Sequence, residues 1–171
     1  MRPGGGHPMT QAGVLFVCTG NICRSPTAHG VFLHKLRAAG LADRVRVDSA
    51  GTHGYHVGDP PDERTQAHAL RRGYDLSGLR ARQILREDFR SFDRILAMDR
   101  GHLSILRRKA PAGYAGLGLF MDYARPSPGS EVPDPYYGGA QGFERVLDMI
   151  EQAAAGLLQA LEQDLARQGR N

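Results

Sequence analysis

Short apolar runs alternate along the chain with longer segments whose apolar residues recur every three or four positions. Residues 14–18 form a continuous apolar run rich in β-branched and aromatic side chains, which is typical of a strand buried on both faces. Residues 45–51, 92–98 and 117–121 indicate three further strands, the last with the weakest pattern. Because strands alternate with helical segments, we expect a single α/β domain, a doubly wound sheet of four parallel strands with helices on both faces.

A helix is predicted after each of these strands. The first starts at Ser25, since serine is a good N-cap and the proline after it fits the first helical position, and it stops at Gly40. The second covers about residues 62–72, and the third runs from the end of the third strand to residue 109. After a proline-rich stretch, residues 143–165 carry an apolar stripe with a period of 3.6 residues, which predicts a long amphipathic helix.

The composition supports one domain with a proper core. A chain of 171 residues, 41% of them hydrophobic, buries roughly 70% of its unfolded surface and needs no disulfide or metal to fold. No apolar run approaches the ~18 residues of a membrane span, and residues 1–13 are rich in glycine and proline and lack the apolar segment of a secretory signal. We expect a soluble, cytoplasmic domain over residues 14–171, preceded by a disordered N-terminal extension, residues 1–13.

The charge is uneven along the chain. The net charge is +4, but residues 131–171 carry −4, so the first 130 residues carry +8. A basic surface attracts nucleic acid or another anionic partner such as phosphate. The sequence has no recognition-helix pattern, no RNA-binding aromatic motif and no zinc finger. We therefore expect no nucleic-acid and no membrane partner, and the charge alone identifies no ligand.

The two cysteines are the most unusual feature of the composition. Cys18 and Cys23 are the only ones in the chain, and both fall in the short loop that follows the first strand. Two cysteines do not make a disulfide framework in a chain of this length. Because ligands of parallel sheets bind at the carboxyl ends of strands, this loop is the first candidate for a functional site.

The segment from Cys18 to Ser25 has the composition of an anion-binding loop. A short turn between a strand and a helix can direct successive backbone N–H groups inward, and the planar guanidinium of Arg24 adds parallel donors to phosphate oxygens. Cys18 would then lie among N–H dipoles, a helix N-terminus and a guanidinium, all of which favour a thiolate. A nucleophile inside a phosphate cradle predicts phosphoryl transfer through a covalent thiophosphate. The loop lacks the Gly-Lys-Ser/Thr ending of a nucleotide-binding Walker loop.

The stretch of residues 14–26, VLFVCTGNICRSP, resembles the phosphate loop of low-molecular-weight protein tyrosine phosphatases. Further matches follow in the order of that family and together span residues 14–168. They are Ser49-Ala50-Gly51-Thr52, Ala81-Arg82-Gln83, Met98-Asp99 and Asp134-Pro135-Tyr136-Tyr137-Gly138.

The resemblance implies hydrolysis of phosphotyrosine in proteins through a cysteinyl-phosphate intermediate, without a metal or organic cofactor. It makes Cys18 the nucleophile and gives Arg24 the binding of the phosphoryl oxygens and stabilisation of the transition state. Asp134 would protonate the leaving phenolate and then activate the hydrolytic water, because an oxygen leaving group needs a proton donor. The implied partners are tyrosine-phosphorylated proteins, with a tyrosine kinase as one candidate.

The resemblance also assigns supporting residues. Asn21 and Ser25 would brace the loop, and Ser25 would also help the thiolate leave. Cys23 would form a reversible disulfide with the nucleophile and protect it from over-oxidation; the alternative is a small buried filler. The remaining members of the phosphate loop are Thr19, Gly20 and Ile22, and the aromatic rings that would form the walls of the substrate slot are Tyr55, Tyr136 and Tyr137.

Some positions depart from the family pattern or allow two interpretations. His29 stands where the family commonly has Glu, and Leu79 where several relatives have His, so we expect the supporting contacts of the loop to differ from the family pattern at these two positions. Asp99 either orients the loop or caps a helix. The two cysteines, His29 and His34 do not have the spacing of a zinc finger, so we expect no metal site.

Three other functions remain as alternatives. Arsenate reductases on the same scaffold pass a disulfide to further cysteines, and this chain has none after Cys23. Protein-arginine phosphatases tend to have Thr where this chain has Ile22, and Phe rather than Tyr after Asp-Pro. A phosphate-binding module without catalysis would not need Cys18, Arg24 and Asp134 together.

Overall fold

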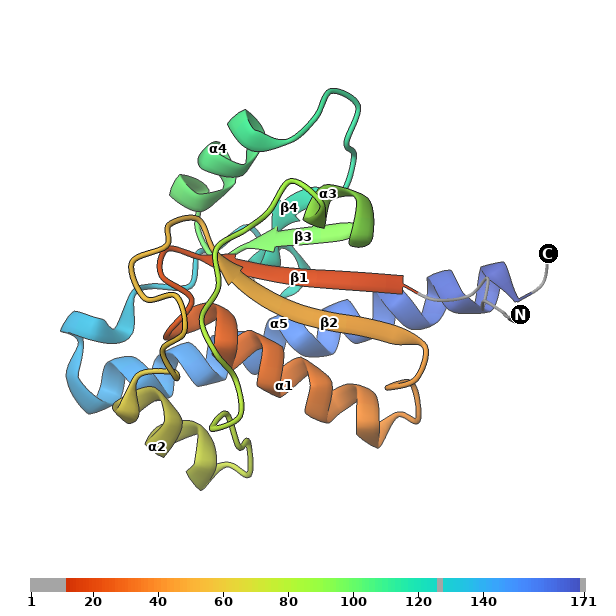
Figure 1. Cartoon of the computed structure of the whole chain (residues 1–171). Coiled ribbons are helices and arrows are strands. Elements are labelled where there is room, and N and C mark those ends of the chain that lie inside the picture. The colour runs from red at the N-terminus through yellow and green to blue at the C-terminus, as the bar shows by residue number, and fades with distance from the viewer. Residues whose placement is uncertain (1–11, 126–127, 170–171) are drawn as a thin grey trace.

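Within residues 12–125 and 128–169, which the computed structural model describes, four parallel strands form one sheet in the order β2-β1-β3-β4 (Figure 1). The strands are β1 (Ala12–Cys18), β2 (Val45–Gly51), β3 (Arg94–Ala97) and β4 (Leu117–Leu119). The α-helices are α1 (Arg24–Ala38), α2 (Glu63–Arg71), α3 (Asp88–Ser91), α4 (Arg100–Lys109) and α5 (Gly139–Gln168). Two 3₁₀ turns, η1 (Phe120–Tyr123) and η2 (Pro135–Tyr137), precede α5.

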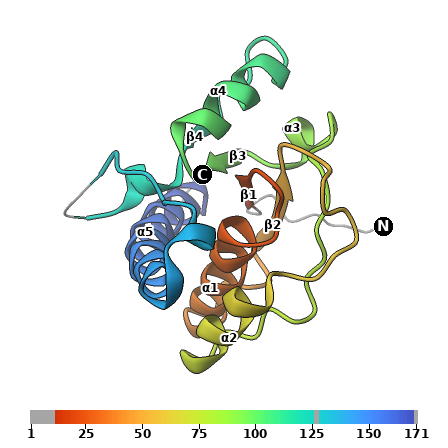
Figure 2. The ribbon, with the colours of Figure 1, turned by 90° about the vertical axis from the view of Figure 1, so that its left-hand side faces the viewer.

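The helices cover both faces of the sheet. Helices α1 and α5 lie side by side on one face, while α3 and α4 lie on the other, as the two perpendicular views show (Figures 1 and 2). Strand β1 is buried throughout: Val14 and Phe16 pack on the α1 and α5 side, and Leu15 and Val17 on the α3 and α4 side. This two-sided burial is what the apolar run predicts, and the predicted doubly wound α/β fold is confirmed.

Several boundaries differ from the predictions. Strand β1 begins at Ala12, two residues earlier than expected, and residues 1–11 of the predicted extension lie outside the described residues. Strand β3 is shorter than 92–98, because Phe92 ends the short helix α3, which was not predicted. Strand β4 ends at Leu119, where the 3₁₀ turn η1 takes over. None of the helices in the described ranges is long and apolar enough to cross a lipid bilayer.

The start of α1 also differs. Ser25, predicted as the N-cap, is the second residue of the helix, and Cys23 occupies the cap position without a side-chain hydrogen bond. The Ser25 hydroxyl instead points back into the loop, where other groups use it. The end of the helix follows the prediction, because Gly40 has a positive φ of 72° and its N–H donates to Arg37 O at 3.1 Å.

The strand order creates a crevice at the carboxyl end of the sheet. From β1 the chain crosses to β2 on one side and then to β3 on the other, so the loops after β1 and β3 diverge at a topological switch point. Residues 19–23 follow β1 here, and Met98 and Asp99 follow β3. The fold therefore brings the cysteine-containing loop to the position where parallel sheets bind ligands.

Candidate active site

The loop of residues 19–23 is held from behind by the end of β2. Thr52 N donates to Cys18 O at 2.8 Å. The two segments approach so closely that a Cβ atom on Gly51 would stand 2.7 Å from Thr19 O, so only glycine fits at this position. This packing fixes the loop backbone at its first residue.

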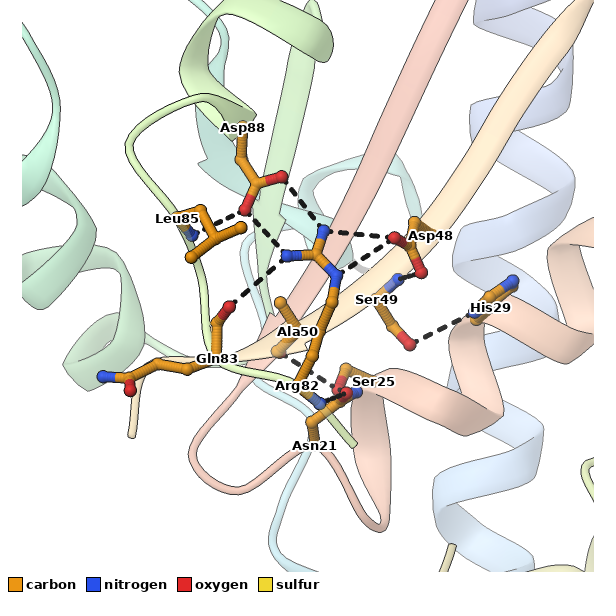
Figure 3. Close-up of polar contacts among 10 residues, drawn as sticks. All are labelled: Asn21, Ser25, His29, Asp48, Ser49, Ala50, Arg82, Gln83, Leu85 and Asp88. Atoms are coloured by element: carbon orange, nitrogen blue, oxygen red, sulfur yellow. Dashed lines mark hydrogen bonds and ion pairs between the residues drawn. The ribbon is translucent and has the colours of Figure 1, made fainter. Parts of the chain in front are cut away.

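Asn21 lies in the middle of the loop with a left-handed backbone. Its φ is 60°, a conformation that costs energy for a residue with a side chain. The buried side chain is held at both ends: Nδ2 donates to Ser25 Oγ at 2.8 Å, and Oδ1 accepts from Arg82 N at 3.0 Å (Figure 3). These bonds offset the strain, and the geometry is consistent with the bracing role predicted for Asn21.

Cys18 is the last residue of β1 and forms the floor of the loop. Its Sγ lies 3.0 Å from Ser25 Oγ, and either atom can be the donor. Ser25 Oγ also lies 3.4 Å from Ala50 O, at the end of β2. The Ser25 hydroxyl is therefore shared between the loop, the thiol and the sheet, which explains why it does not cap α1.

Arg24 begins α1 and is almost completely buried. Its Nη1 donates to Asp99 Oδ2 at 3.0 Å and to Val132 O at 3.0 Å. Both contacts use Nη1, so they orient the guanidinium without occupying Nη2. The predicted phosphate-binding arginine thus has a fixed direction.

Asp99 fulfils both functions proposed for it from the sequence. Oδ1 accepts from His102 N at 2.9 Å and caps α4, while Oδ2 holds Arg24. Partial burial opposes ionisation of Asp99, but the N–H and ring of His102 and the guanidinium of Arg24 outweigh it and hold its pKa below the usual range. Asp99 is therefore a carboxylate at neutral pH.

Asp134 lies on a segment anchored to the same end of the sheet. Val132 N donates to Met98 O at 2.9 Å, just beyond β3, and Val132 O holds Arg24. Asp134 caps the 3₁₀ turn η2, since its Oδ1 accepts from Tyr136 N at 3.0 Å. The side chain itself is solvent-exposed.

One cavity of about 260 Å³ is lined by most of the predicted site residues. The side chains of Asn21 and Ser25 are buried and do not line this cavity. His56 was not predicted, although it follows the expected wall residue Tyr55 directly. The lining residues are Cys18, Thr19, Gly20, Ile22, Cys23, Arg24, Tyr55, His56, Asp134 and Tyr136.

Two aromatic rings stand at the mouth of this cavity, and each is supported by a neighbour. Tyr55 is 71% exposed and stacks on His53, with 5.0 Å between ring centroids. Tyr136 is covered by the Arg64 guanidinium at 5.0 Å. Tyr137 ends η2, and its predicted role as a wall residue stays a prediction.

Cys23 is buried and, like Cys18, has a free thiol. Burial raises its pKa to about 11, and the nearby Asp62 carboxylate adds to that effect. Cys23 is therefore a neutral thiol at neutral pH. Its predicted redox role stays a prediction.

His29 replaces the expected Glu without leaving a gap. It is buried, and its Nδ1 lies 3.1 Å from Ser49 Oγ on β2 (Figure 3). Burial lowers its pKa, so the ring is neutral at neutral pH. Leu79, where relatives have His, packs partly buried against the core. In the described ranges, no group of three or more His, Cys, Asp or Glu is arranged to hold a metal ion.

The sheet and its helices make this an α/β protein, and a loop between a parallel strand and a helix at the switch point is where many such proteins bind phosphate groups. The family model for low molecular weight phosphotyrosine protein phosphatase matches residues 13–167. A low molecular weight protein-tyrosine-phosphatase of Streptomyces coelicolor is 46% identical over 156 residues, covering 89% of this chain and 94% of its own length.

Relatives from eukaryotes belong to the same family. The human low molecular weight phosphotyrosine protein phosphatase is 42% identical over 149 residues, 85% of this chain and 93% of its own. A protein tyrosine phosphatase from Entamoeba histolytica, crystallised with Hepes in its active site, superposes with a TM-score of 0.86 at 38% identity, covering 90% of this chain and 98% of its own. The chain belongs to the low molecular weight phosphotyrosine protein phosphatase family, as its sequence predicts.

Proposed function

We propose that this phosphatase hydrolyses phosphotyrosine in proteins, with Cys18 as nucleophile, Arg24 as phosphoryl-binding residue and Asp134 as general acid and base. The observation that carries this assignment is the cavity that these three residues line together. Cys18 lies at its floor, Arg24 is aimed by Asp99, and Asp134 stands on the segment that Val132 fixes beside Arg24. This arrangement supports the binding of one phosphoryl group between the three residues.

The first step transfers the phosphoryl group to sulfur. Loop N–H groups and Arg24 bind its non-bridging oxygens, and the Cys18 thiolate attacks phosphorus, so that an S–P bond forms while the P–O bond to the phenol breaks. Asp134 donates its proton to the departing phenolate oxygen. Tyrosine leaves, and Asp134 is then a carboxylate.

The second step regenerates the enzyme. Asp134 removes a proton from water, the water oxygen attacks phosphorus and the S–P bond breaks, which releases inorganic phosphate. Ser25 Oγ lies within hydrogen-bond distance of the departing sulfur and can stabilise the thiolate by donating a hydrogen bond to it. In this proposal Asn21 keeps Ser25 in place for that bond.

The walls of the cavity favour an aromatic phosphate ester. Tyr55 and Tyr136 can sandwich a flat ring as it enters, and stacked or edge contacts of this kind favour phosphotyrosine over an aliphatic ester. We include Tyr137 in this wall as part of the proposal. The protein substrates are tyrosine-phosphorylated proteins, and a tyrosine kinase is one candidate.

Cys23 completes the proposal as a redox partner of Cys18. If peroxide oxidises Cys18 to a sulfenic acid, the Cys23 thiol can condense with it, forming a disulfide and releasing water. Both cysteines line the same cavity, which supports this pairing. The disulfide would protect the nucleophile from irreversible oxidation and would be reduced by a thiol.

Two substitutions test the chemistry. Cys18→Ser should abolish hydrolysis of a phosphotyrosine peptide. Asp134→Ala should lower kcat/KM for phosphotyrosine about 10²- to 10⁴-fold, with a much smaller loss for p-nitrophenyl phosphate, because p-nitrophenolate leaves without a proton. Steady-state kinetics under reducing conditions at mildly acid pH provide both measurements. A fully active Cys18→Ser protein, or equal losses on both substrates for Asp134→Ala, would contradict the roles assigned here.

The same assay separates the alternatives. The phosphatase should hydrolyse phosphotyrosine much faster than phosphoarginine, since the cavity walls are built from tyrosine rings. A preference for phosphoarginine, or an inability to hydrolyse any aryl phosphate while still binding inorganic phosphate, would favour one of the other functions.

A further inference from the structure

His102 lies in the first turn of α4 and contacts the phosphate loop at Thr19. It is 4% exposed, and its Nε2 lies 2.7 Å from Thr19 Oγ1. Thr19 directly follows Cys18 in the chain and lines the candidate active-site cavity. A buried imidazole thus touches the residue next to the proposed nucleophile, although the two positions are 83 residues apart in sequence.

The same imidazole faces the carboxylate that aims Arg24. Its Nδ1 lies 3.1 Å from Asp99 Oδ1, in contact but without the geometry of a hydrogen bond. Asp99 Oδ1 also accepts from the His102 backbone N–H, and Oδ2 accepts from Arg24. One His–Asp pair therefore contacts both ends of the loop, Thr19 at its start and Arg24 at its end.

The protonation of this pair decides the direction of the bond to Thr19. Burial lowers the pKa of His102 to about 4, against the opposing effect of the Asp99 carboxylate, so the ring is neutral at neutral pH. A neutral imidazole carries one N–H, and a carboxylate beside Nδ1 favours that hydrogen on Nδ1. Nε2 is then an acceptor, and the Thr19 hydroxyl donates to it.

We propose that His102 is a positioning residue of the phosphatase, which ties the first residue of the phosphate loop to the carboxylate that orients Arg24. The inference rests on the proposed function of that loop. A ring of donors stabilises a phosphoryl group only if its N–H groups and the guanidinium converge on one point before the substrate arrives. The Thr19 side-chain bond fixes the loop at its start, and Asp99 fixes the guanidinium at its end.

A residue that only filled the core would behave differently. Its removal would lower the stability of the fold without a selective effect on oxyanion binding. A positioning residue acts through its partner, so removing either partner should have a similar effect on catalysis, and removing both should add little. The conservative change Thr19→Ser should cost much less activity than Thr19→Val, because serine keeps the hydroxyl.

The experiment compares Thr19→Val, Thr19→Ser, His102→Leu and the double variant Thr19→Val/His102→Leu. Tyr114→Phe is the matched control, since it removes another partly buried side-chain bond, from Tyr114 Oη to Phe92 O at 2.6 Å, far from the loop. The measurements are kcat and KM with p-nitrophenyl phosphate, the affinity for inorganic phosphate by calorimetry, and the melting temperature.

We expect Thr19→Val and His102→Leu each to lower kcat/KM and phosphate affinity by about tenfold. The double variant should fall no further than about twofold below the singles, and Thr19→Ser should lose much less activity than Thr19→Val, because it keeps the hydroxyl. Tyr114→Phe should lower the melting temperature while leaving kcat/KM unchanged. Wild-type values for Thr19→Val, or losses that multiply in the double variant, would overturn the proposal.

The experiment also covers a variant that does not fold and a wild type that does not hydrolyse aryl esters. If His102→Leu fails to fold, the contrast between Thr19→Val and Thr19→Ser decides the question alone, because valine differs from threonine only in having a methyl group in place of the hydroxyl. If the wild-type protein binds phosphate but hydrolyses no aryl ester, the proposed function fails, whereas phosphate calorimetry still tests the role of His102.

Discussion

At the scale of single residues, the loop depends on one strained conformation. Asn21 combines a positive φ with a buried side chain whose two ends are both bonded. Glycine would relax the backbone but lose the bonds, while alanine would lose the bonds and keep the strain. The two substitutions therefore separate the contribution of the bonds from that of the backbone.

We predict that Asn21→Ala lowers the free energy of unfolding by about 1 kcal/mol more than Asn21→Gly, which is the cost of a left-handed backbone for a residue with a Cβ atom. Both should lower kcat/KM, since both release Ser25. Urea denaturation monitored by circular dichroism measures the stability difference. Equal stability of the two variants would show that the loop abandons the left-handed conformation once the Asn21 side chain is gone.

At the scale of elements, a short segment joins the end of β2 and braces the loop. Gly51 N donates to Arg82 O at 2.8 Å and Ile84 N donates to Gly51 O at 2.9 Å, so residues 82–84 extend the sheet by one bridge. The Arg82 guanidinium pairs with Asp88 at 3.0 Å and with Asp48 at 3.1 Å (Figure 3). The backbone N–H of Arg82 donates to the Asn21 side chain, while the Arg82 guanidinium anchors residues 82–84 to Asp48 and Asp88.

We predict that Arg82→Gln lowers the free energy of unfolding by about 3 kcal/mol, because the buried Asp88 carboxylate loses its guanidinium partner and keeps only the bond from Leu85 N. The double variant Arg82→Gln/Asp88→Asn should recover a large part of that loss, since it removes the uncompensated charge as well. Urea denaturation of the three proteins provides the measurement. A double variant that is less stable than Arg82→Gln would show that the packing of the guanidinium, rather than the charge pair, holds the segment.

The elements with a strong periodic pattern were predictable, and the short ones were not. The apolar run of β1 and the stripe of α5 report burial directly, whereas the four-residue helix α3 and the turn η2 are too short for a period to emerge. In the site, Cys18 and Arg24 share one loop between a strand and a helix, and the composition of that loop and its resemblance to a known phosphate loop indicated both residues. His102 and Thr19 meet only through the fold, so no local pattern indicated their contact.

At the scale of the whole molecule, two histidines couple the stability of the fold to pH. His29 packs between α1 and β2, and His102 between α4 and the phosphate loop. Burial lowers the pKa of both rings, that of His102 from 6.5 to about 4. Between pH 6.5 and about pH 4 the folded chain therefore binds fewer protons than the unfolded chain.

The sign of the effect follows from that difference. When the unfolded state binds more protons than the folded state, the free energy of unfolding falls as the pH falls. The stability should be constant above about pH 7, decline from pH 6.5 and keep declining until about pH 4, where His102 also becomes protonated in the folded state. Each tenfold difference in proton affinity between the two states corresponds to about 1.4 kcal/mol, so His102 alone contributes a loss on the order of 3 kcal/mol across this window.

Urea denaturation at pH 7.5, above the unfolded pKa of His102, and at pH 6 and 5, between its unfolded and folded pKa, measures this decline. His102→Gln provides the comparison, because glutamine does not titrate and can keep a polar group near Thr19. As the pH falls, the free energy of unfolding of His102→Gln should decrease less steeply than that of the wild type. His29 should account for part of the decrease that remains. A wild type whose stability is unchanged between pH 7.5 and 5 would contradict a lowered pKa of these two rings in the folded state.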